Sequence, residues 1–577
     1  MVQLYEPRGH QGAYIDGQVE RLQTEVADYN NTNVGIGKTP ITFMLARRLN
    51  LPLFVVGPKV GKEIWEGAAE DQGVEIFFES YGKLATNSSN KITHGLLTRE
   101  TIRTETPDTP SADTPEKKNM IKKGPVYRWV HYYPTELLQT IIQAGALFVF
   151  DEVHDARNDN QTSQMVLAIC QEVMFSGSPS RVVLLSATPV GSAEQYLNIA
   201  NVLGYFGYGN RHVHPGMDME LVYRNGTTSE AEYKANKKKY EIKGSSMEIQ
   251  ESRAKAVLDL VIRPISSACP REESEWKHVI TDTYYAINPL LHYKATTNLN
   301  DLEAVLKDKE LGDGDVDVGK KKKAAAHTLE TCKIPVVLAS VMNILRSVEG
   351  SQIIIGAIHT STIMYLTGMI RAMGYDVIRY DGKSTAADRR AGIAAFNAGE
   401  VRVFVMNVVA GGTGISLHDT EGGRPRFMFR FPNFRALESI QFAGRAYRSG
   451  VASDVRTRGV YTQIENEVRM RASAVKAGDA IAGILDDDEA EDRIMPASYT
   501  AEVPEEVQLT VAGDIVSGVN SVEEAERVVE AHLGGKKVIP TTKKKKARAT
   551  ATSRKTPVAR KIKGQKTVRT KIPSGRR

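Results

Sequence analysis

Residues 32–39 read Thr-Asn-Val-Gly-Ile-Gly-Lys-Thr, and an apolar stretch follows them. Glycines let backbone N–H groups come close to phosphate oxygens, Lys38 can neutralise the outer phosphates, and the Thr39 hydroxyl can hold Mg2+. The phosphates would lie at the N-terminus of a helix, where the dipole favours anions and where Pro40 is tolerated. Thr32 stands where the usual pattern has its first glycine, so a glycine-rich turn with an incidental lysine remains the alternative. The residues predicted to contact the phosphates are Gly35, Ile36, Gly37, Lys38 and Thr39.

Two carboxylates follow a second apolar run. Residues 151–154 read Asp-Glu-Val-His and come directly after apolar residues 146–150, which we expect to form a buried strand. Ligands bind at the carboxyl ends of strands in open α/β sheets. Asp151 can therefore hold Mg2+ through water, and Glu152 can polarise the water that attacks a γ-phosphate. A solvated acidic loop is the alternative, and the phosphate loop upstream disfavours it.

Two further stretches are compatible with nucleotide chemistry. Ser-Ala-Thr at residues 186–188 follows an apolar run, and its hydroxyls could relay the state of the nucleotide to a domain interface. Residues 441–448 read Gln-Phe-Ala-Gly-Arg-Ala-Tyr-Arg and place Arg445 and Arg448 on one face of a helix. An arginine from a second domain can stabilise charge on a transferring phosphoryl group. A helix with surface ion pairs is the alternative.

Short apolar runs alternate with helix-like stretches, which predicts a parallel α/β architecture. β-branched and aromatic enrichment favours strands over buried helix segments. The expected strands are residues 53–56, 147–150 and 182–185 in the first half and 353–355, 403–406 and 427–429 in the second. Apolar residues at helical spacing over 336–348 predict an amphipathic helix that leads into the second half.

Three polar segments interrupt this pattern: residues 86–125 are expected to be a surface insertion, residues 205–250 contain a lysine cluster, and residues 307–327 are expected to be a flexible linker. We therefore predict five segments. They are an ATP-binding domain over 1–206, a connecting region over 207–330, a second α/β domain over 331–485, an acidic linker with a short helical part over 486–535, and a basic tail over 536–577.

Charge is distributed unevenly along the 577 residues. The formal net charge is +6, from 75 Lys+Arg against 69 Asp+Glu. Residues 536–577 hold 17 of the basic residues and no acidic one, which leaves 58 against 69, or −11, for residues 1–535. A tail of this composition cannot build a core, so we expect it to be disordered and to contact the phosphate backbone of nucleic acid in a salt-dependent way. A nuclear localisation signal and a solubilising tail are the alternatives, and the acidic patch at 486–492 could fold back on the tail.

Composition excludes several classes of protein. No apolar run approaches the ~18 residues of a membrane helix, and the N-terminus lacks a signal pattern, so no membrane partner is expected. The three cysteines lie far apart, which excludes a disulfide framework and a multi-cysteine zinc cluster. His212 and His214 have no further ligands nearby and are interpreted as loop residues.

In this order, the phosphate loop, the Asp-Glu-Val-His box, the Ser-Ala-Thr triplet and the arginine stretch resemble the motifs of superfamily 2 helicases. The finer resemblance, over about residues 4–480, is to SWI/SNF-like DNA-translocating ATPases. The further stretches that carry it are residues 7–11, 55–58 with Trp65, 80–81, 151–158 with Ser163, 380–382 with Arg389, 396–397 and 411–417. Val153, Ala187 and the pair Ser449-Gly450 depart from the family pattern, which argues more against nucleosome remodelling than against movement on a duplex.

The resemblance implies two RecA-like domains that bind ATP and Mg2+ between them. It implies that Gln11 reads adenine, that Gly414 contacts the nucleotide, and that Thr39 and Asp151 hold Mg2+. The implied coupling residues are His154, Ser186 and Thr188, and the implied catalytic residues are Glu152, Gln441, Arg445 and Arg448.

The expected activity is ATP-driven movement on, or remodelling of, duplex DNA. An RNA helicase acting in transcription or RNA release and an inactive nucleic-acid-binding scaffold are the alternatives. The sequence also resembles helicase-like proteins of large double-stranded DNA viruses. That resemblance implies an intracellular setting (a nucleus, a viral factory or a virion) with transcription or virion proteins as partners.

Overall fold

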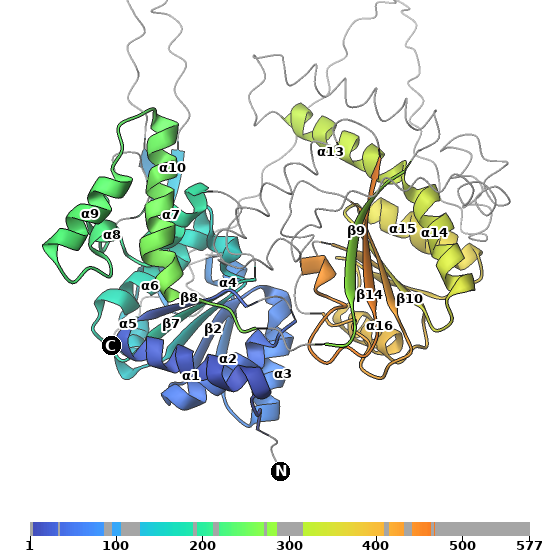
Figure 1. The fold of residues 1–577 in the computed structure, drawn as a ribbon, viewed down its shortest axis with the longest axis horizontal. Coiled ribbons are helices and arrows are strands. Elements are labelled where there is room, and N and C mark those ends of the chain that lie inside the picture. The colour runs from blue at the N-terminus through green and yellow to red at the C-terminus, as the bar shows by residue number, and fades with distance from the viewer. Residues whose placement is uncertain are drawn as a thin grey trace, which may run out of the picture. The chain divides into compact units, whose positions relative to one another are not determined.

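The structure is a computed structural model of the chain, drawn in Figure 1. It describes residues 4–32, 35–85, 95–104, 127–187, 193–209, 211, 218–270, 274–285, 316–408, 415–431, 441–462 and 467. Every element described below lies within Met1–His532. The basic tail, the acidic patch and the two histidines at 212 and 214 lie outside the described residues.

The first sheet has six parallel strands in the order β3-β2-β6-β7-β1-β8. Their bounds are β1 Ala27–Asn30, β2 Leu53–Gly57, β3 Ile76–Ser80, β6 Leu147–Asp151, β7 Arg181–Leu185 and β8 Ser266–Ser267. The three strands predicted in this half are confirmed as β2, β6 and β7. Strands β1, β3 and β8 were not predicted, because polar residues such as Asp28 and Glu79 interrupt their apolar patterns.

Helices cover both faces of this sheet (Figure 1). Leu147 and Val149 of β6 join a core with α1, α2 and α3, whereas Phe148 and Phe150 join a core with α5, α6 and α7. This alternation is why the strand is apolar throughout, as parallel strands buried on both sides are. The helix bounds are α1 Gly9–Thr24, α2 Lys38–Leu49, α3 Lys62–Gln72, α4 Tyr81–Ala85, α5 Glu136–Ala144, α6 Gln161–Phe175 and α7 Ala193–Val202.

The second sheet also has six parallel strands, in the order β11-β12-β10-β13-β14-β9. Their bounds are β9 His278–Tyr285, β10 Gln352–Ala357, β11 Val377–Tyr380, β12 Val403–Asn407, β13 Arg426–Arg430 and β14 Val455–Thr462. Strands β10, β12 and β13 confirm the three predicted in this half. Helices α14 (Ile334–Ser347) and α15 (Thr360–Ala372) pack on one face, and α16 (Ala386–Asn397) packs on the other.

The amphipathic helix predicted over 336–348 is confirmed as α14. The stretch Ala324–Ser347 is long and apolar enough to cross a membrane by composition, but most of it is buried. Its residues Val337, Val341 and Leu345 pack into the core of the second sheet. The stretch is therefore explained as core packing, with a turn at Cys332–Lys333 between two helices.

The structure divides the predicted connecting region, residues 207–330, between the two sheets. It supplies β8 to the edge of the first sheet and β9 to the edge of the second. The prediction of a flexible linker is wrong for residues 316–327, because helix α13 spans Val316–Thr331. Alanine and lysine, which are strong helix formers, outweigh the polar composition there.

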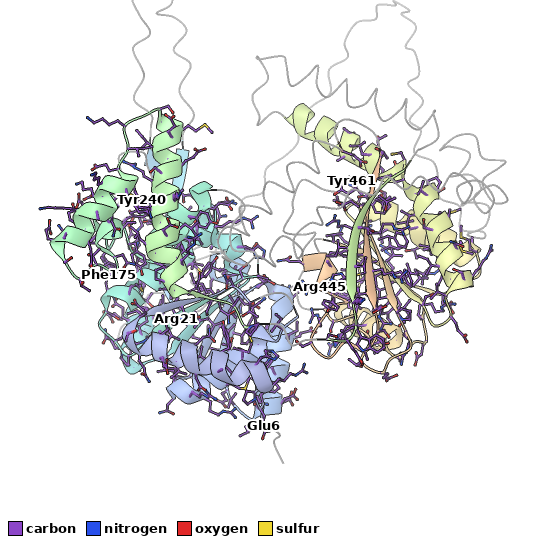
Figure 2. All side chains as sticks on the ribbon, viewed as in Figure 1. Glu6, Arg21, Phe175, Tyr240, Arg445 and Tyr461 are labelled. Carbon is purple, nitrogen blue, oxygen red and sulfur yellow. The ribbon has the colours of Figure 1, made fainter. Side chains whose placement is uncertain are left out.

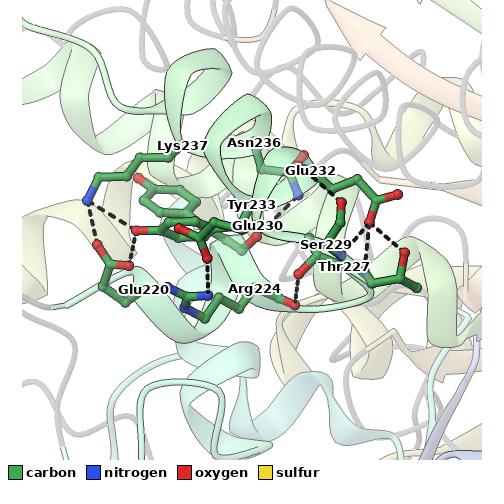
Figure 3. Close-up of polar contacts among 11 residues, drawn as sticks. Glu220, Arg224, Thr227, Ser229, Glu230, Glu232, Tyr233, Asn236 and Lys237 are labelled. Atoms are coloured by element: carbon green, nitrogen blue, oxygen red, sulfur yellow. Dashed lines mark hydrogen bonds and ion pairs between the residues drawn. The ribbon is translucent and has the colours of Figure 1, made fainter.

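The lysine cluster within 205–250 lies in a group of short helices. Helices α8 (Glu220–Arg224), α9 (Glu230–Tyr240) and α10 (Ser246–Val257) are followed by a π-helical turn over Leu258–Ile262 and by α11 (Arg263–Ile265). Figure 3 shows how α8 and α9 are joined: Lys237 Nζ lies 2.5 Å from Glu220, and the Tyr233 hydroxyl donates to the same carboxylate. Arg224 stacks on the Tyr233 ring, with its guanidinium carbon 3.9 Å from the ring centre.

Part of the predicted surface insertion over 86–125 is regular structure. Strand β4 (Leu97–Thr104) pairs antiparallel with β5 (Tyr127–Pro134), and Leu97 and Tyr132 are buried in the first domain's core. Residues 86–94 and 105–126 lie outside the described residues. The hairpin stem was missed because threonine, arginine and glutamate separate its few apolar residues, so the stretch contains no continuous apolar run.

Candidate functional site

The glycine-rich loop connects β1 to α2. Gly35 and Gly37 have φ angles of 86° and 97°, in the left-handed region that glycine adopts without strain. Helix α2 begins at Lys38, and the Lys38 ammonium donates to the carbonyl of Thr32 at 2.9 Å. Thr39 is half-buried in the first helical turn. The described part of the loop therefore leads directly into a helix N-terminus, where backbone N–H groups can bind an anion.

Gln11 of α1 lies against this loop. Its Nε2 donates to the carbonyl of Ile36 at 3.0 Å, and its Oε1 accepts from the Arg8 backbone N–H at 3.1 Å. The Gln11 side chain is 4% exposed. The bond to Ile36 braces the loop, the bond from Arg8 closes the first turn of α1, and the role in reading adenine stays a prediction.

The two carboxylates lie where the sequence places them, at the C-terminal end of β6. Asp151 is the last residue of the strand, and its Oδ2 accepts from Trp65 Nε1 at 2.9 Å. The Tyr81 hydroxyl donates to the Asp151 carbonyl at 2.8 Å. Glu152 adopts a left-handed backbone with φ 52°, a strained conformation for a residue with a Cβ. That backbone turns the chain sharply immediately after the strand.

Charge around the carboxylates separates their pKa values. Burial and the adjacent Glu152 raise the pKa of Asp151 to about 6. Burial alone would also raise the pKa of Glu152, but hydrogen bonding to His154 and the charges of Lys38 and Arg445 lower it to about 2. Glu152 is therefore held ionised, as an activator of water must be. Burial lowers the pKa of Lys38, and both carboxylates oppose that effect.

His154 joins the carboxylate pair to the next strand. Its Nδ1 lies 3.2 Å from Glu152 Oε2 and 3.3 Å from Ser186 Oγ. Ser186 is fully buried after β7, and its N–H donates to the Asn30 carbonyl at the end of β1 at 3.1 Å. Three of the predicted residues are thus in one chain of contacts. Thr188, predicted to act with Ser186, lies outside the described residues.

Side chains of the second α/β domain reach the same carboxylate. Gln441 Nε2 lies 3.4 Å from Glu152 Oε2. Arg445 (labelled in Figure 2) is 2% exposed, and its Nε and Nη2 have no hydrogen-bond partner among the described residues. Burial lowers the pKa of Arg445 to about 10, although Glu152 opposes this. A buried guanidinium with unused N–H groups has capacity for an anionic ligand.

Arg448 contacts the phosphate loop through its aliphatic stem. A Cβ added to Gly35 would lie 2.5 Å from Arg448 Cγ, so any larger residue fits there only if Arg448 moves. The guanidinium donates to the Ile415 carbonyl at 2.7 Å, and the Ser449 N–H donates to the Gly35 carbonyl at 3.1 Å. Arg448 thus differs from Arg445 in being already hydrogen-bonded. Gly414 lies outside the described residues.

These residues fit ATP with Mg2+. Thr39, Asp151 and Glu152 offer oxygen atoms, which Mg2+ prefers, and Mg2+ in such sites takes one or two carboxylates plus phosphate oxygens. The described residues include no group of three or more His, Cys, Asp or Glu that could hold a metal without a ligand. Oxygen atoms of the nucleotide's phosphates would then complete the coordination of Mg2+.

Tertiary contacts add to the site several residues whose roles the sequence does not indicate. Trp65 and Tyr81 hold Asp151 through its side chain and its backbone, respectively. Thr32 is fully buried, and its Oγ1 accepts from the Cys269 N–H at 2.8 Å, which ties the loop to the chain leaving β8. Thr32 stands out in the sequence because it replaces a glycine of the usual pattern. Its partner Cys269 lies 237 residues away, so the sequence could not indicate the contact.

Comparison with known proteins identifies one family model and several similar chains. The model of the helicase conserved C-terminal domain matches residues 336–450. A protein of Acanthamoeba polyphaga mimivirus named as an ATP-dependent RNA helicase is 24% identical over 485 residues, which are 80% of this chain and 80% of that protein. The family match bears out the helicase prediction over residues 336–450.

Two solved structures are similar at lower identity. A Sulfolobus solfataricus SWI2/SNF2 ATPase core in complex with dsDNA is 12% identical, covers 86% of this chain and 100% of its own, and has a TM-score of 0.28. The C-terminal part of the Fun30 ATPase domain is 14% identical, covers 37% of this chain and 97% of its own, and has a TM-score of 0.28.

Proposed function

The chain is a helicase-type ATPase, and from this premise we propose that it couples ATP hydrolysis to movement along duplex DNA. The observation that carries the proposal is Arg445, a buried arginine of the second domain. Two of its nitrogens, Nε and Nη2, have no hydrogen-bond partner among the described residues, and its charge acts on Glu152 of the first domain. Such an arginine can stabilise charge on a transferring phosphoryl group.

The proposed roles follow from the contacts. The loop N–H groups and Lys38 bind phosphates, and for this Lys38 exchanges the Thr32 carbonyl for a phosphate oxygen. Thr39 and Asp151 hold Mg2+, which neutralises charge on the phosphates when bound. Glu152 orients the attacking water, because its low pKa keeps it ionised and able to accept a hydrogen bond from that water. Arg445 donates to the γ-phosphate.

Movement would arise from making and breaking the contacts between the two domains. Gln441, Arg445 and Ser449 contact or act on residues of the first domain at the site itself. Their interactions with Glu152 and Gly35 can therefore differ between the ATP-bound and product-bound states. A difference in those contacts is what would convert hydrolysis into a change of domain arrangement.

Duplex DNA is proposed as the track because the finer motif resemblance is to DNA translocases. The mimivirus relative carries an RNA helicase name, which keeps RNA as the second candidate. The tail over 536–577, with 17 basic residues and no acidic one, is proposed to contact phosphate backbones. The viral relative supports a setting in a virus-infected cell, and we propose a viral factory, nucleus or virion as the place of action.

An ATPase assay tests the proposal. Purified protein is given duplex DNA, single-stranded DNA and RNA in turn, and we expect stimulation by duplex DNA. Stimulation by RNA alone would establish the second candidate instead. Lys38→Ala and Glu152→Gln are expected to abolish turnover while nucleic-acid binding persists, and Glu349→Gln, an exposed residue of the second domain, is the control. Near-normal hydrolysis in both site variants would overturn the assignment.

A further inference from the structure

Trp65 makes a polar contact from within the core of the first domain. It lies on α3, is 1% exposed, and packs in the core formed with α1 and α2. Its ring lies 5.8 Å from that of Phe43 on α2, the helix that begins with Lys38. Its Nε1 donates to Asp151 Oδ2 on β6 at 2.9 Å. One side chain therefore connects the phosphate-loop helix to the carboxylate proposed to hold Mg2+.

The surroundings of Asp151 leave little freedom for its carboxylate. A Cβ added to Gly57 would lie 3.1 Å from Asp151 Cβ, and one added to Gly61 would lie 3.6 Å from Oδ2. Both glycines precede α3, so the chain leading to Trp65 closes around the Oδ2 side of the carboxylate. On that side the indole N–H donates to Oδ2, and the Glu152 backbone N–H also hydrogen-bonds to the Asp151 carboxylate.

With Oδ2 accepting from the indole, a lone pair of the other carboxylate oxygen can bind a ligand. A carboxylate that binds a metal is oriented by hydrogen bonds from groups outside the metal's own shell, and loss of such a bond typically costs about 10–100-fold in metal affinity or activity. A buried tryptophan also seldom leaves its N–H without a partner. Both requirements are met here by one hydrogen bond.

We propose that Trp65 is a positioning residue of the metal site. Its indole N–H holds Asp151 Oδ2, so that the remaining oxygen is presented to Mg2+ or to a water bound to it. The inference deepens the proposed function and rests on it. Trp65 acts through Asp151 and does not touch the nucleotide in this assignment.

The test measures Mg2+-dependent nucleotide binding, which does not require turnover. ADP with a methylanthraniloyl label on its ribose is bound to the full chain, first in EDTA and then during titration with MgCl2. Fluorescence anisotropy is recorded with direct excitation of the label, so that loss of a tryptophan does not change the signal. For Trp65→Phe we expect unchanged affinity in EDTA and at least about a tenfold rise in the Mg2+ concentration at the half-point.

Two controls distinguish loss of the Trp65–Asp151 hydrogen bond from disturbance of the surrounding core. Phe43→Leu disturbs the same core without removing the hydrogen bond, so its Mg2+ half-point should equal that of the parent. If Trp65→Phe does not fold, replacement of Trp65 by benzothienylalanine keeps the ring shape, substitutes sulfur for the N–H, and serves as the same test. A Mg2+ half-point in the N–H-deficient protein equal to the parent's would overturn the inference. A parent chain that shows no Mg2+-dependent binding would instead overturn the proposed function.

Discussion

Replacing Gly35 by alanine is expected to reduce ATP turnover by about 100-fold while the chain stays folded. The added Cβ would lie 2.5 Å from Arg448 Cγ and 3.1 Å from Arg448 Cα, whereas ordinary contacts begin at 3.4 Å. Arg448 must therefore retreat by about 1 Å, and a displacement of that size near reacting groups can cost about 10²-fold in rate. Because Ser449 donates to the Gly35 carbonyl, the retreat also disturbs that bond.

Backbone strain contributes a separate and smaller effect. Gly35 has a φ of 86°, and the left-handed conformation costs a residue with a Cβ about 1–2 kcal/mol. Gly177→Ala is the matched control, since Gly177 has a φ of 64° and an added Cβ there meets nothing within 4 Å. Both variants should lose similar stability in urea denaturation, and only Gly35→Ala should lose turnover.

The assay is steady-state ATP hydrolysis at saturating ATP and nucleic acid, with stability measured in parallel. Turnover by Gly35→Ala within about threefold of the parent would refute the reasoning, because the contact between Gly35 and Arg448 would then not belong to the hydrolysing state. An equal loss of turnover in Gly177→Ala would show that strain alone explains the effect.

Three further predictions concern buried polar groups. Thr32→Val leaves the buried Cys269 N–H without its 2.8 Å acceptor and should cost about 1–3 kcal/mol in urea denaturation, whereas Thr32→Ser should retain most of it. Lys333→Met leaves the Glu467 carboxylate, 1% exposed, with its hydrogen bonds from Thr462 but without a positive partner, and should cost about 3–5 kcal/mol by the same measurement. Burial and nearby arginines lower the pKa of His418 to about 4, so the unfolded chain binds a proton there between pH 6.5 and 4 and the folded chain does not. Stability should fall as the pH drops through that range, and His418→Gln should show a smaller loss of Tm between about pH 7.5 and 4.5.

Local sequence was sufficient to predict the elements with the clearest residue patterns. Strand β6 is apolar from Leu147 to Phe150, and the carboxylates follow it at once, so both the strand and the position of Asp151 and Glu152 could be predicted. The glycine-rich loop likewise predicted the start of α2, because the conformations at Gly35 and Gly37 are local properties. These predictions were possible because each feature is determined by residues adjacent to it in the chain.

Edge strands and connecting segments were harder to predict. Strand β8 is only Ser266–Ser267, and it exists because it pairs with Tyr29 and Asn30 of β1. Helix α13 contains four successive lysines and was mistaken for a linker, since a polar composition does not distinguish a solvated helix from an irregular segment. For β8 the deciding factor was pairing with a distant strand, and for α13 it was helix propensity.

The sequence by itself determined that this chain has two parallel α/β domains, and which of its residues have the chemistry for ATP. Periodicity, glycine conformation and residue type are local, so they can be inferred from the order of amino acids. Only the tertiary structure decided that Trp65 holds one oxygen of Asp151 and that Thr32 binds Cys269. It also decided that Arg445 is buried with donors that no described residue uses. Hydrogen bonds and burial depend on strand order and helix packing, which bring together residues up to hundreds of positions apart.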